Sequence, residues 1–361
     1  MRPLIAALLL FVLAPAARAA EEKVLNVYNW ADYIAPDTVS NFEKEFGIHV
    51  NYDVYDSTEV VEAKLLTGHT GYDVVVHSYR YSARLIPVGV YHKLDRSKLP
   101  LLKNIDPWVL SVTNAYDPGN QYGVPYMWGS TGFAYNRDMV LKRVPDAPLD
   151  SAAMLFDPKI VSKLADCGVT LLDEPTDVIP LVMIYLGHDP NSLAPDDLAD
   201  AERQLKLVRP YIRYFSSSRM LNDLPNHEVC VAMSWSGDYA QAEARAREVG
   251  SNVNLAYTAP REGTVLWVDG VFIPRDAPHP DNAHKFINYL LRGKVMGAIS
   301  NTTHYASANL AANAYVLPEI LHDPAVFPSP EVRSRFYTGL IFGPKLERAR
   351  TRAWSRIKTG L

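Results

Sequence analysis

Residues 24–76 read VLNVYNWADYIAPDTVSNFEKEFGIHVNYDVYDSTEVVEAKLLTGHTGYDVVV, and the spacing of apolar residues in this stretch decides the fold. Short apolar or alternating runs predict strands at residues 24–28, 48–55 and 73–76. Apolar residues at helical spacing predict helices at residues 36–46 and 57–66, with Ser57 as the N-cap of the second. This alternation of strands and helices predicts an α/β lobe with a largely parallel sheet.

The rest of the chain continues in the same style, and its length is sufficient for a second lobe. Helices are expected at residues 139–141, 158–164, 196–208, 238–249 and 279–291, and from residue 329 onward. Strands are expected at residues 169–172, 229–234, 253–257 and 264–273. Because no flexible linker separates the halves, we expect the chain to cross between two lobes more than once.

The first residues have the layout of a secretory signal peptide. Arg2 supplies a positive charge, residues 4–13 are apolar, and Ala17-Arg18-Ala19 is a small-x-small cleavage signal. The apolar run is too short to span a membrane. We therefore expect a signal peptide at residues 1–19 and a free mature protein in the periplasm, since no cysteine follows the cleavage site to carry a lipid anchor.

The charge balance is weakly acidic once the predicted signal peptide is set aside. Without Arg2 and Arg18 the 36 basic residues become 34, against 40 acidic residues. In the absence of a basic run, this composition argues against a nucleic-acid partner and is compatible with a cationic ligand.

The chain has two cysteines, Cys167 and Cys230. In an exported protein they are expected to form one disulfide bond, because the periplasm is oxidising. Two separate buried thiols are the alternative interpretation.

Sequence motifs for catalysis and for cofactor binding are absent. No G-x-G-x-x-G, P-loop or G-x-S-x-G stretch occurs. His227-Glu228 lacks the second histidine of a zinc-protease helix, and the ten histidines show no metal-binding spacing. We therefore expect no catalytic residue, no cofactor and no metal, although a triad assembled from scattered residues would leave no motif.

Tryptophan or tyrosine is paired with aspartate at the ends of several predicted elements. These groups are Trp30-Ala31-Asp32-Tyr33, Trp235 with Asp238, Trp267 with Asp269, the acidic stretch 173–177, and His304-Tyr305. Ligands of open α/β sheets bind beyond the carboxyl ends of the strands. Aromatic rings and carboxylates gathered there suit an alkyl chain with ammonium ends, because rings attract cations and carboxylates pair with them.

Each of these residues also has an ordinary structural interpretation. A single tryptophan such as Trp30, Trp235 or Trp267 is as typical of a core as of a site. Asp32 or Asp238 alone is also typical of a helix N-cap, and Asp177 of an ordinary loop. Composition and position therefore indicate an aromatic and acidic cleft without identifying its ligand.

The chain resembles the periplasmic putrescine- and spermidine-binding proteins of polyamine ABC importers over essentially its whole mature length. The stretches that carry this resemblance are Tyr28-Asn-Trp-Ala-Asp-Tyr33, Val124-Pro-Tyr-Met-Trp-Gly129, Cys167-Gly-Val169, Tyr185-Leu-Gly-His-Asp-Pro-Asn-Ser192, Ile212-Arg-Tyr-Phe215, Ser234-Trp-Ser-Gly-Asp238, Tyr305-Ala-Ser-Ala-Asn309 and Arg350-Thr-Arg-Ala-Trp354. The resemblance implies a two-lobe periplasmic-binding-protein fold, each lobe a mostly parallel sheet flanked by helices, joined by crossover strands at a hinge. Lobe 1 is then expected at residues 24–130 plus 262–304, and lobe 2 at residues 131–258 plus 308–361.

The resemblance also implies a site and partners. The implied aromatic residues are Trp30, Tyr33, Trp235, Trp267 and Tyr305. The implied ammonium-binding acids are Asp32, Asp177, Asp238 and Asp269, with Ser78 as a hydroxyl contact. The family pairs its two cysteines, which favours the disulfide. The implied partners are a small cationic amine and an inner-membrane ABC permease complex, and the protein is expected to be a monomer.

One residue departs from the family pattern. Arg80 stands where polyamine binders have a small or aromatic residue near the far end of the ligand. Its guanidinium would repel a second ammonium unless Glu174 neutralised it. Alternatively, Arg80 contacts the carboxylate of an ω-amino acid such as 4-aminobutyrate or 5-aminovalerate, or it points to solvent. An amine-processing enzyme and a signalling receptor are the alternatives of another class.

Overall fold

The computed structural model describes residues 21–55, 58–340 and 342–360. The predicted signal peptide at residues 1–19 and the predicted N-cap at Ser57 lie outside these residues. Within the described part of the chain, no helix combines the length and the apolar character that crossing a membrane requires.

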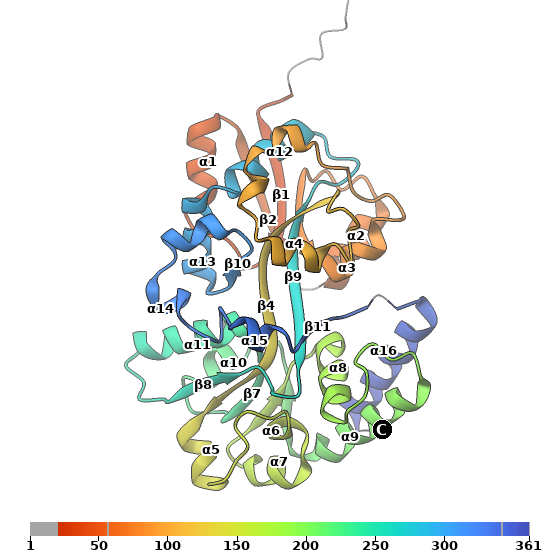
Figure 1. Ribbon diagram of the computed structural model, residues 1–361, viewed down its shortest axis with the longest axis vertical. Coiled ribbons are helices and arrows are strands. Elements are labelled where there is room, and N and C mark those ends of the chain that lie inside the picture. Colours follow the sequence, from red (N-terminus) through yellow and green to blue (C-terminus); the bar gives the residue numbers. More distant parts are fainter. Residues whose placement is uncertain (1–20, 56–57, 341, 361) are drawn as a thin grey trace, which may run out of the picture.

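Figure 1 shows two lobes, one above the other, with strands β4 and β9 running between them. The upper lobe begins with three strands whose parallel pairing follows the predicted alternation: β1 (Val24–Trp30), β2 (His49–Tyr55) and β3 (Val74–Ser78). β3 is buried along its whole length, as a strand covered on both faces must be. The helices of this segment are α1 (Thr38–Phe46), α2 (Thr58–Thr67), α3 (Tyr79–Leu85), η1 (Arg96–Lys98), η2 (Pro100–Asn104) and α4 (Pro107–Thr113).

The lower lobe has a second set of parallel strands, β5 (Val169–Leu171), β6 (Ile212–Phe215) and β7 (Val231–Trp235). Its helices are α5 (Arg137–Arg143), α6 (Ala153–Phe156), α7 (Pro158–Leu164), α8 (Pro175–Tyr185), α9 (Pro195–Val208), η3 (Arg209–Tyr211), α10 (Met220–Asp223) and α11 (Ser236–Glu248). Strand β8 (Leu255–Thr258) pairs with the lower end of β4.

Two long antiparallel strands, β4 (Gly123–Asn136) and β9 (Thr264–Phe272), join the lobes. They make one sheet path with the order β2-β1-β3-β9-β4-β7-β5-β6. β9 matches the predicted strand, whereas β4 was not predicted. All fourteen residues of β4 are buried, so its sequence shows no alternation of apolar and polar residues that would reveal a strand.

The C-terminal part returns to the upper lobe and then descends. Its elements are α12 (Pro280–Leu290), α13 (Gly293–Thr303), β10 (Ala306–Ser307), η4 (Leu310–Tyr315), α14 (Pro318–Leu321), α15 (Pro330–Arg333), β11 (Phe336–Thr338) and α16 (Pro344–Thr359). The expectation of helix from residue 329 onward is therefore wrong at β11, which pairs with β9. The apolar face of α16 packs with the lower lobe through Ala353, Trp354 and Ile357. The division of the chain between lobes stays a prediction.

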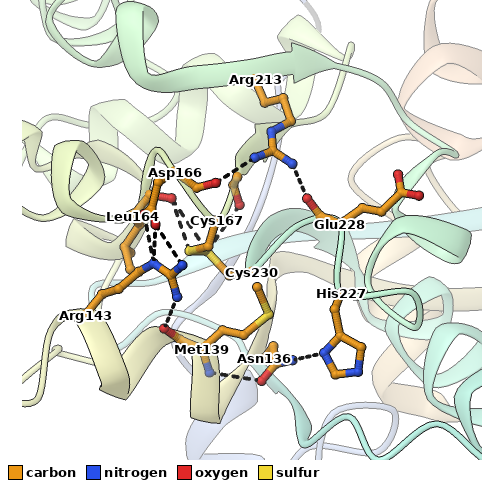
Figure 2. The surroundings of a disulfide bond; sticks show 11 residues. Asn136, Met139, Arg143, Leu164, Asp166, Cys167, Arg213, His227, Glu228 and Cys230 are labelled. Carbon is orange, nitrogen blue, oxygen red and sulfur yellow. Dashed lines mark hydrogen bonds and ion pairs between the residues drawn. A yellow bond between two sulfur atoms is a disulfide. The ribbon is translucent and has the colours of Figure 1, made fainter.

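A disulfide bond joins Cys167 and Cys230, as predicted, and brings the segment before β5 to the segment before β7 (Figure 2). Arg213 bridges the same two segments, because its guanidinium donates to the backbone carbonyls of Asp166 and Glu228. Gly168 has a φ of +96°, and a Cβ there would lie 2.7 Å from the Arg213 Cζ atom. Glycine therefore permits this close approach.

Candidate functional site

Pairing between strands brings the predicted site residues of both lobes to the strand crossing, the region where the paired strands β4 and β9 pass from one lobe to the other. Ser78 at the end of β3 lies opposite Asp269 on β9. On β4, Gly129 lies opposite Trp267, and Thr131 lies opposite Trp235 at the end of β7. The site thus draws on strand ends and crossing strands rather than on one loop.

Aromatic rings form a connected group at this crossing. The ring of Tyr305 lies 5.1 Å from that of Trp267 and 5.8 Å from that of Tyr33, nearly perpendicular to both. Edge-to-face contacts of this kind favour a defined arrangement. Trp30 packs instead on Tyr55, with ring centroids 4.3 Å apart.

A glycine in the first turn of α11 lets Tyr305 approach. A Cβ on Gly237 would lie 2.4 Å from the Tyr305 ring, which is closer than real contacts permit. The adjacent Asp238 carboxylate accepts a hydrogen bond of 2.5 Å from the Tyr305 hydroxyl. The absence of a side chain at Gly237 therefore allows Tyr305 to lie against Asp238.

Asp238 is a half-buried carboxylate and Asp269 a buried one. Burial raises the pKa of Asp238 to about 6, and the hydrogen bond from Tyr305 and the charge of Arg245 oppose the shift. Burial raises the pKa of Asp269 to about 7. The Tyr33 hydroxyl lies near enough to oppose that shift, although it makes no hydrogen bond of ordinary length and angle. Neither carboxylate is in an ion pair with a side chain of the described residues.

Asp177 lies in the first turn of α8 and is buried. The Thr131 hydroxyl of β4 donates to its carboxylate. Burial raises the pKa of Asp177, while the Thr131 hydrogen bond and the charge of Arg80 oppose the shift. Asp177 therefore has a cation of the protein nearby, as Asp238 has in Arg245, whereas no cation acts on the pKa of Asp269.

Arg80 reaches from α3 toward α8 and does not point to solvent. Its Nη1 atom donates to the backbone carbonyl of Thr176 at 2.8 Å. The Glu174 carboxylate accepts from Thr176 Oγ1 at 2.6 Å and from the Tyr81 hydroxyl at 3.4 Å. The structure thus connects Arg80 to α8 through the Thr176 backbone, and its predicted contact with a ligand stays a prediction.

Asp32 lies apart from the other acids. It is exposed, in a turn after β1, and has a left-handed backbone with a φ of +54°. Trp30 and Tyr33 on either side of the turn are more buried than Asp32. The role that the resemblance implies for Asp32 stays a prediction.

Several buried polar atoms at the crossing lack hydrogen-bond partners among the described residues. They are Trp30 Nε1, Tyr33 Oη and Trp267 Nε1. Unsatisfied buried donors are unfavourable, and their presence in one region is typical of a binding site.

Some contributors to the site were not predicted from sequence. Thr131 holds Asp177, and the Tyr126 hydroxyl donates to the backbone carbonyl of Tyr33 at 2.8 Å. Gly237 was recognised as part of a motif but not as the residue that admits Tyr305. The available signal was the glycine between Trp235 and Asp238, because a glycine beside site residues often marks a close approach.

Residues 37–328 match the family of bacterial extracellular solute-binding proteins. The chain belongs to this family. It is 46% identical to the putrescine-binding periplasmic protein PotF of Escherichia coli K12, over 95% of this chain and 93% of that protein. It is 43% identical to a putrescine/agmatine-binding protein of Pseudomonas aeruginosa, over 96% and 95% of the two chains.

Solved structures of solute-binding proteins share the two-lobe fold. A putative spermidine/putrescine ABC transporter protein from Listeria monocytogenes has a TM-score of 0.82 and 29% identity, covering 93% of this chain and 99% of its own. The spermidine/putrescine substrate-binding protein PotD of Streptococcus pneumoniae has a TM-score of 0.78 and 27% identity, with the same coverage. These comparisons confirm the predicted fold class.

The family consists of solute-binding components of transporters. Across the part of the chain that the structure describes, no group of three or more histidine, cysteine, aspartate or glutamate side chains is arranged to hold a metal ion.

Proposed function

We propose that this solute-binding protein captures a small diamine of the putrescine class between its lobes and delivers it to an inner-membrane ABC permease. The protein acts in the periplasm after removal of its signal peptide, as a monomer, and leaves the ligand chemically unchanged. The names of its relatives support this ligand class, because those proteins are called putrescine-binding.

The observation that carries the proposal is the pair of carboxylates beside aromatic rings, the half-buried Asp238 and the buried Asp269. A buried carboxylate without a partner cation is strongly unfavourable, so a cation of the ligand is the expected partner. The faces of Trp267 and Tyr305 attract ammonium groups and cover methylenes. Burying four methylenes contributes about 3 kcal/mol, at roughly 0.8 kcal/mol each.

Ligand capture and lobe closure are coupled in this proposal. The acids and aromatic rings of the site come from both lobes and from the strands β4 and β9 that join them. A ligand therefore contacts all of them only when the lobes are together. A ligand that binds the closed form better shifts the population toward it. A closed, loaded protein is then the form that the permease receives.

Arg80 supports one second candidate, an ω-amino acid such as 5-aminovalerate or 4-aminobutyrate. The Arg80 charge acts on Asp177, one of the acids to which the resemblance assigns ammonium binding. A cation there disfavours a second ammonium and favours a carboxylate. Under this candidate Arg80→Ser reverses a preference of the wild type for 5-aminovalerate over putrescine.

Replacement of Asp269 tests the proposal. Asp269→Asn should weaken putrescine binding by roughly tenfold or more in calorimetry, because it removes a charge-assisted hydrogen bond. Asp196→Asn, at an exposed position in α9, should bind as the wild type does. Unchanged affinity of Asp269→Asn, or conversion of putrescine to another compound during incubation, contradicts the proposal.

A further inference from the structure

The guanidinium of Arg350 on α16 is buried, and the described part of the chain offers its two Nη atoms no hydrogen bond. The residue is 3% exposed, and both Nη1 and Nη2 lack hydrogen-bond partners among the described residues. Burial and the charge of Arg80 lower the pKa of Arg350 to about 10, so it stays protonated at neutral pH. A buried cation in this state requires an anion.

A second unpartnered group and a second cation lie near enough to interact electrostatically with Arg350. The Tyr337 hydroxyl on β11 is buried and has no partner in the described part of the chain. Two residues on, a Cβ at Gly339 would lie 2.9 Å from the Arg80 Cζ atom. The charges of both Arg80 and Arg350 act on the Tyr337 hydroxyl, so Arg80 lies near Tyr337 as well as against the segment that follows β11.

The protein itself does not supply the missing anion within the described residues. The Phe342 ring covers one face of the Arg350 guanidinium. The Arg350 Cζ atom lies 4.6 Å from the centroid of that ring. Glu347, one turn earlier on α16, acts on Arg350 at a distance but makes no ion pair with it. The edge of the guanidinium, where hydrogen bonds form, is left to another group.

We propose that Arg350, Tyr337 and Arg80 form a binding site for a small carboxylate anion. Arg350 offers two parallel N–H groups that match the two oxygens of a carboxylate, Tyr337 offers an O–H, and Arg80 adds positive charge. The carboxylate belongs either to a free anion or to one end of the captured ligand, since the Asp177 charge also acts on Arg80 and Tyr337.

Acetate titration tests the site independently of amine binding. The melting temperature of the full mature protein should rise with the logarithm of the acetate concentration above the dissociation constant, by roughly 2 °C or more at a hundredfold excess. Arg350→Gln should lose this rise, whereas Arg352→Gln, exposed on the same helix, should keep it. General salt effects are common to all three proteins, so equal responses of Arg350→Gln and wild type overturn the site.

Tyr337→Phe keeps the proposal testable should Arg350→Gln fail to fold. Removal of one hydroxyl donor should weaken the apparent acetate affinity by roughly two- to tenfold, the range for one hydrogen bond. An unchanged acetate response of Tyr337→Phe contradicts the site, because the hydroxyl is one of its three donors.

Calorimetry distinguishes the two sources of the carboxylate. If the carboxylate of the captured ligand occupies the site, 5-aminovalerate should bind at least tenfold more tightly than pentylamine. Arg350→Gln should then remove that difference in affinity. A free anion makes 5-aminovalerate and pentylamine bind alike while the acetate response persists. Absence of both the acetate response and the difference overturns the site. Putrescine affinity, measured separately without acetate, reports on the proposed function alone.

Discussion

Two carboxylates at the strand crossing ionise at higher pH than an ordinary aspartate. Burial is the dominant cause for both, with a pKa of about 6 for Asp238 and about 7 for Asp269. An acid that is protonated in the empty site and ionised beside an ammonium couples ligand capture to pH. The dependence of ligand affinity on pH therefore reports on the ionisation of Asp238 and Asp269.

Putrescine affinity should rise between about pH 5 and pH 8. The ligand stays a dication in this range, because alkylammonium groups lose their protons only near pH 10. Asp238 and Asp269, in contrast, become carboxylates. The rise per pH unit should reach at most about tenfold for each ionising group. Calorimetry across this range should show the rise in wild type and a smaller one in Asp269→Asn, and a flat profile in wild type contradicts the assigned shifts.

The stability of the unliganded protein should change in the opposite direction. The pKa of Asp269 in the folded state is raised above its ordinary value, so its contribution to stability is fully present at low pH. That contribution is lost as the pH rises from about 4 to about 7. Asp269→Asn should lessen this loss in thermal melts without ligand.

At the scale of elements, the first turn of α11 packs against the Tyr305 ring at Gly237. Gly237→Ala suits the helix but places a methyl group against the Tyr305 ring. Overpacking of this kind costs about 1–3 kcal/mol, so putrescine binding should weaken by roughly tenfold or more. Gly343→Ala, where nothing lies within 4 Å, is the matched control. Equal affinities of the two variants in calorimetry contradict the role assigned to Gly237.

The disulfide connects the segments that precede β5 and β7, 63 positions apart in sequence. In the chain-entropy description, a loop of this length stabilises the folded state by about 4 kcal/mol. Reduction should lower the free energy of unfolding by roughly that amount in urea titrations. Thiol titration of the unfolded, unreduced protein should detect no reactive thiol, and detection of two would contradict the bond.

At the scale of the whole molecule, a clasp of protein side chains connects the lobes directly. It consists of Arg80 and Tyr81 on α3 and of Glu174 and Thr176 at the start of α8. The Tyr81 hydroxyl lies 3.0 Å from Thr176 Oγ1, and Arg80 donates to the Thr176 carbonyl. Contacts that are present only in the closed form raise its population relative to the open form.

Removal of the Tyr81 hydroxyl should therefore favour the open form. Tyr81→Phe is expected to cost the closed form about 1 kcal/mol, the net value of one hydrogen bond. The apparent putrescine affinity should fall by roughly fivefold, and the radius of gyration without ligand should increase in small-angle scattering. Tyr315→Phe, at an exposed position of η4, should change neither quantity. A Tyr81→Phe protein that scatters and binds like wild type rules out the clasp.

Much of the fold was predictable because it follows from local patterns. The alternation of Leu25 and Val27 and the helical spacing of Phe42 and Phe46 are sufficient to predict β1 and α1. The aromatic and acidic groups at strand ends were visible for the same reason, since each lies within a few consecutive residues. The two cysteines and their oxidising compartment were enough to predict the disulfide.

Tertiary structure decided what depends on residues far apart in the chain. β4 is a strand because both its faces are covered by other segments, and β11 is one because β9 lies beside it. Arg80 finds its partner 96 positions away at Thr176, and the Arg350 guanidinium has no hydrogen-bond partner for its Nη atoms within the described residues. Sequence patterns report how each residue fits its own element, whereas pairing and burial between distant segments arise only when the chain is folded.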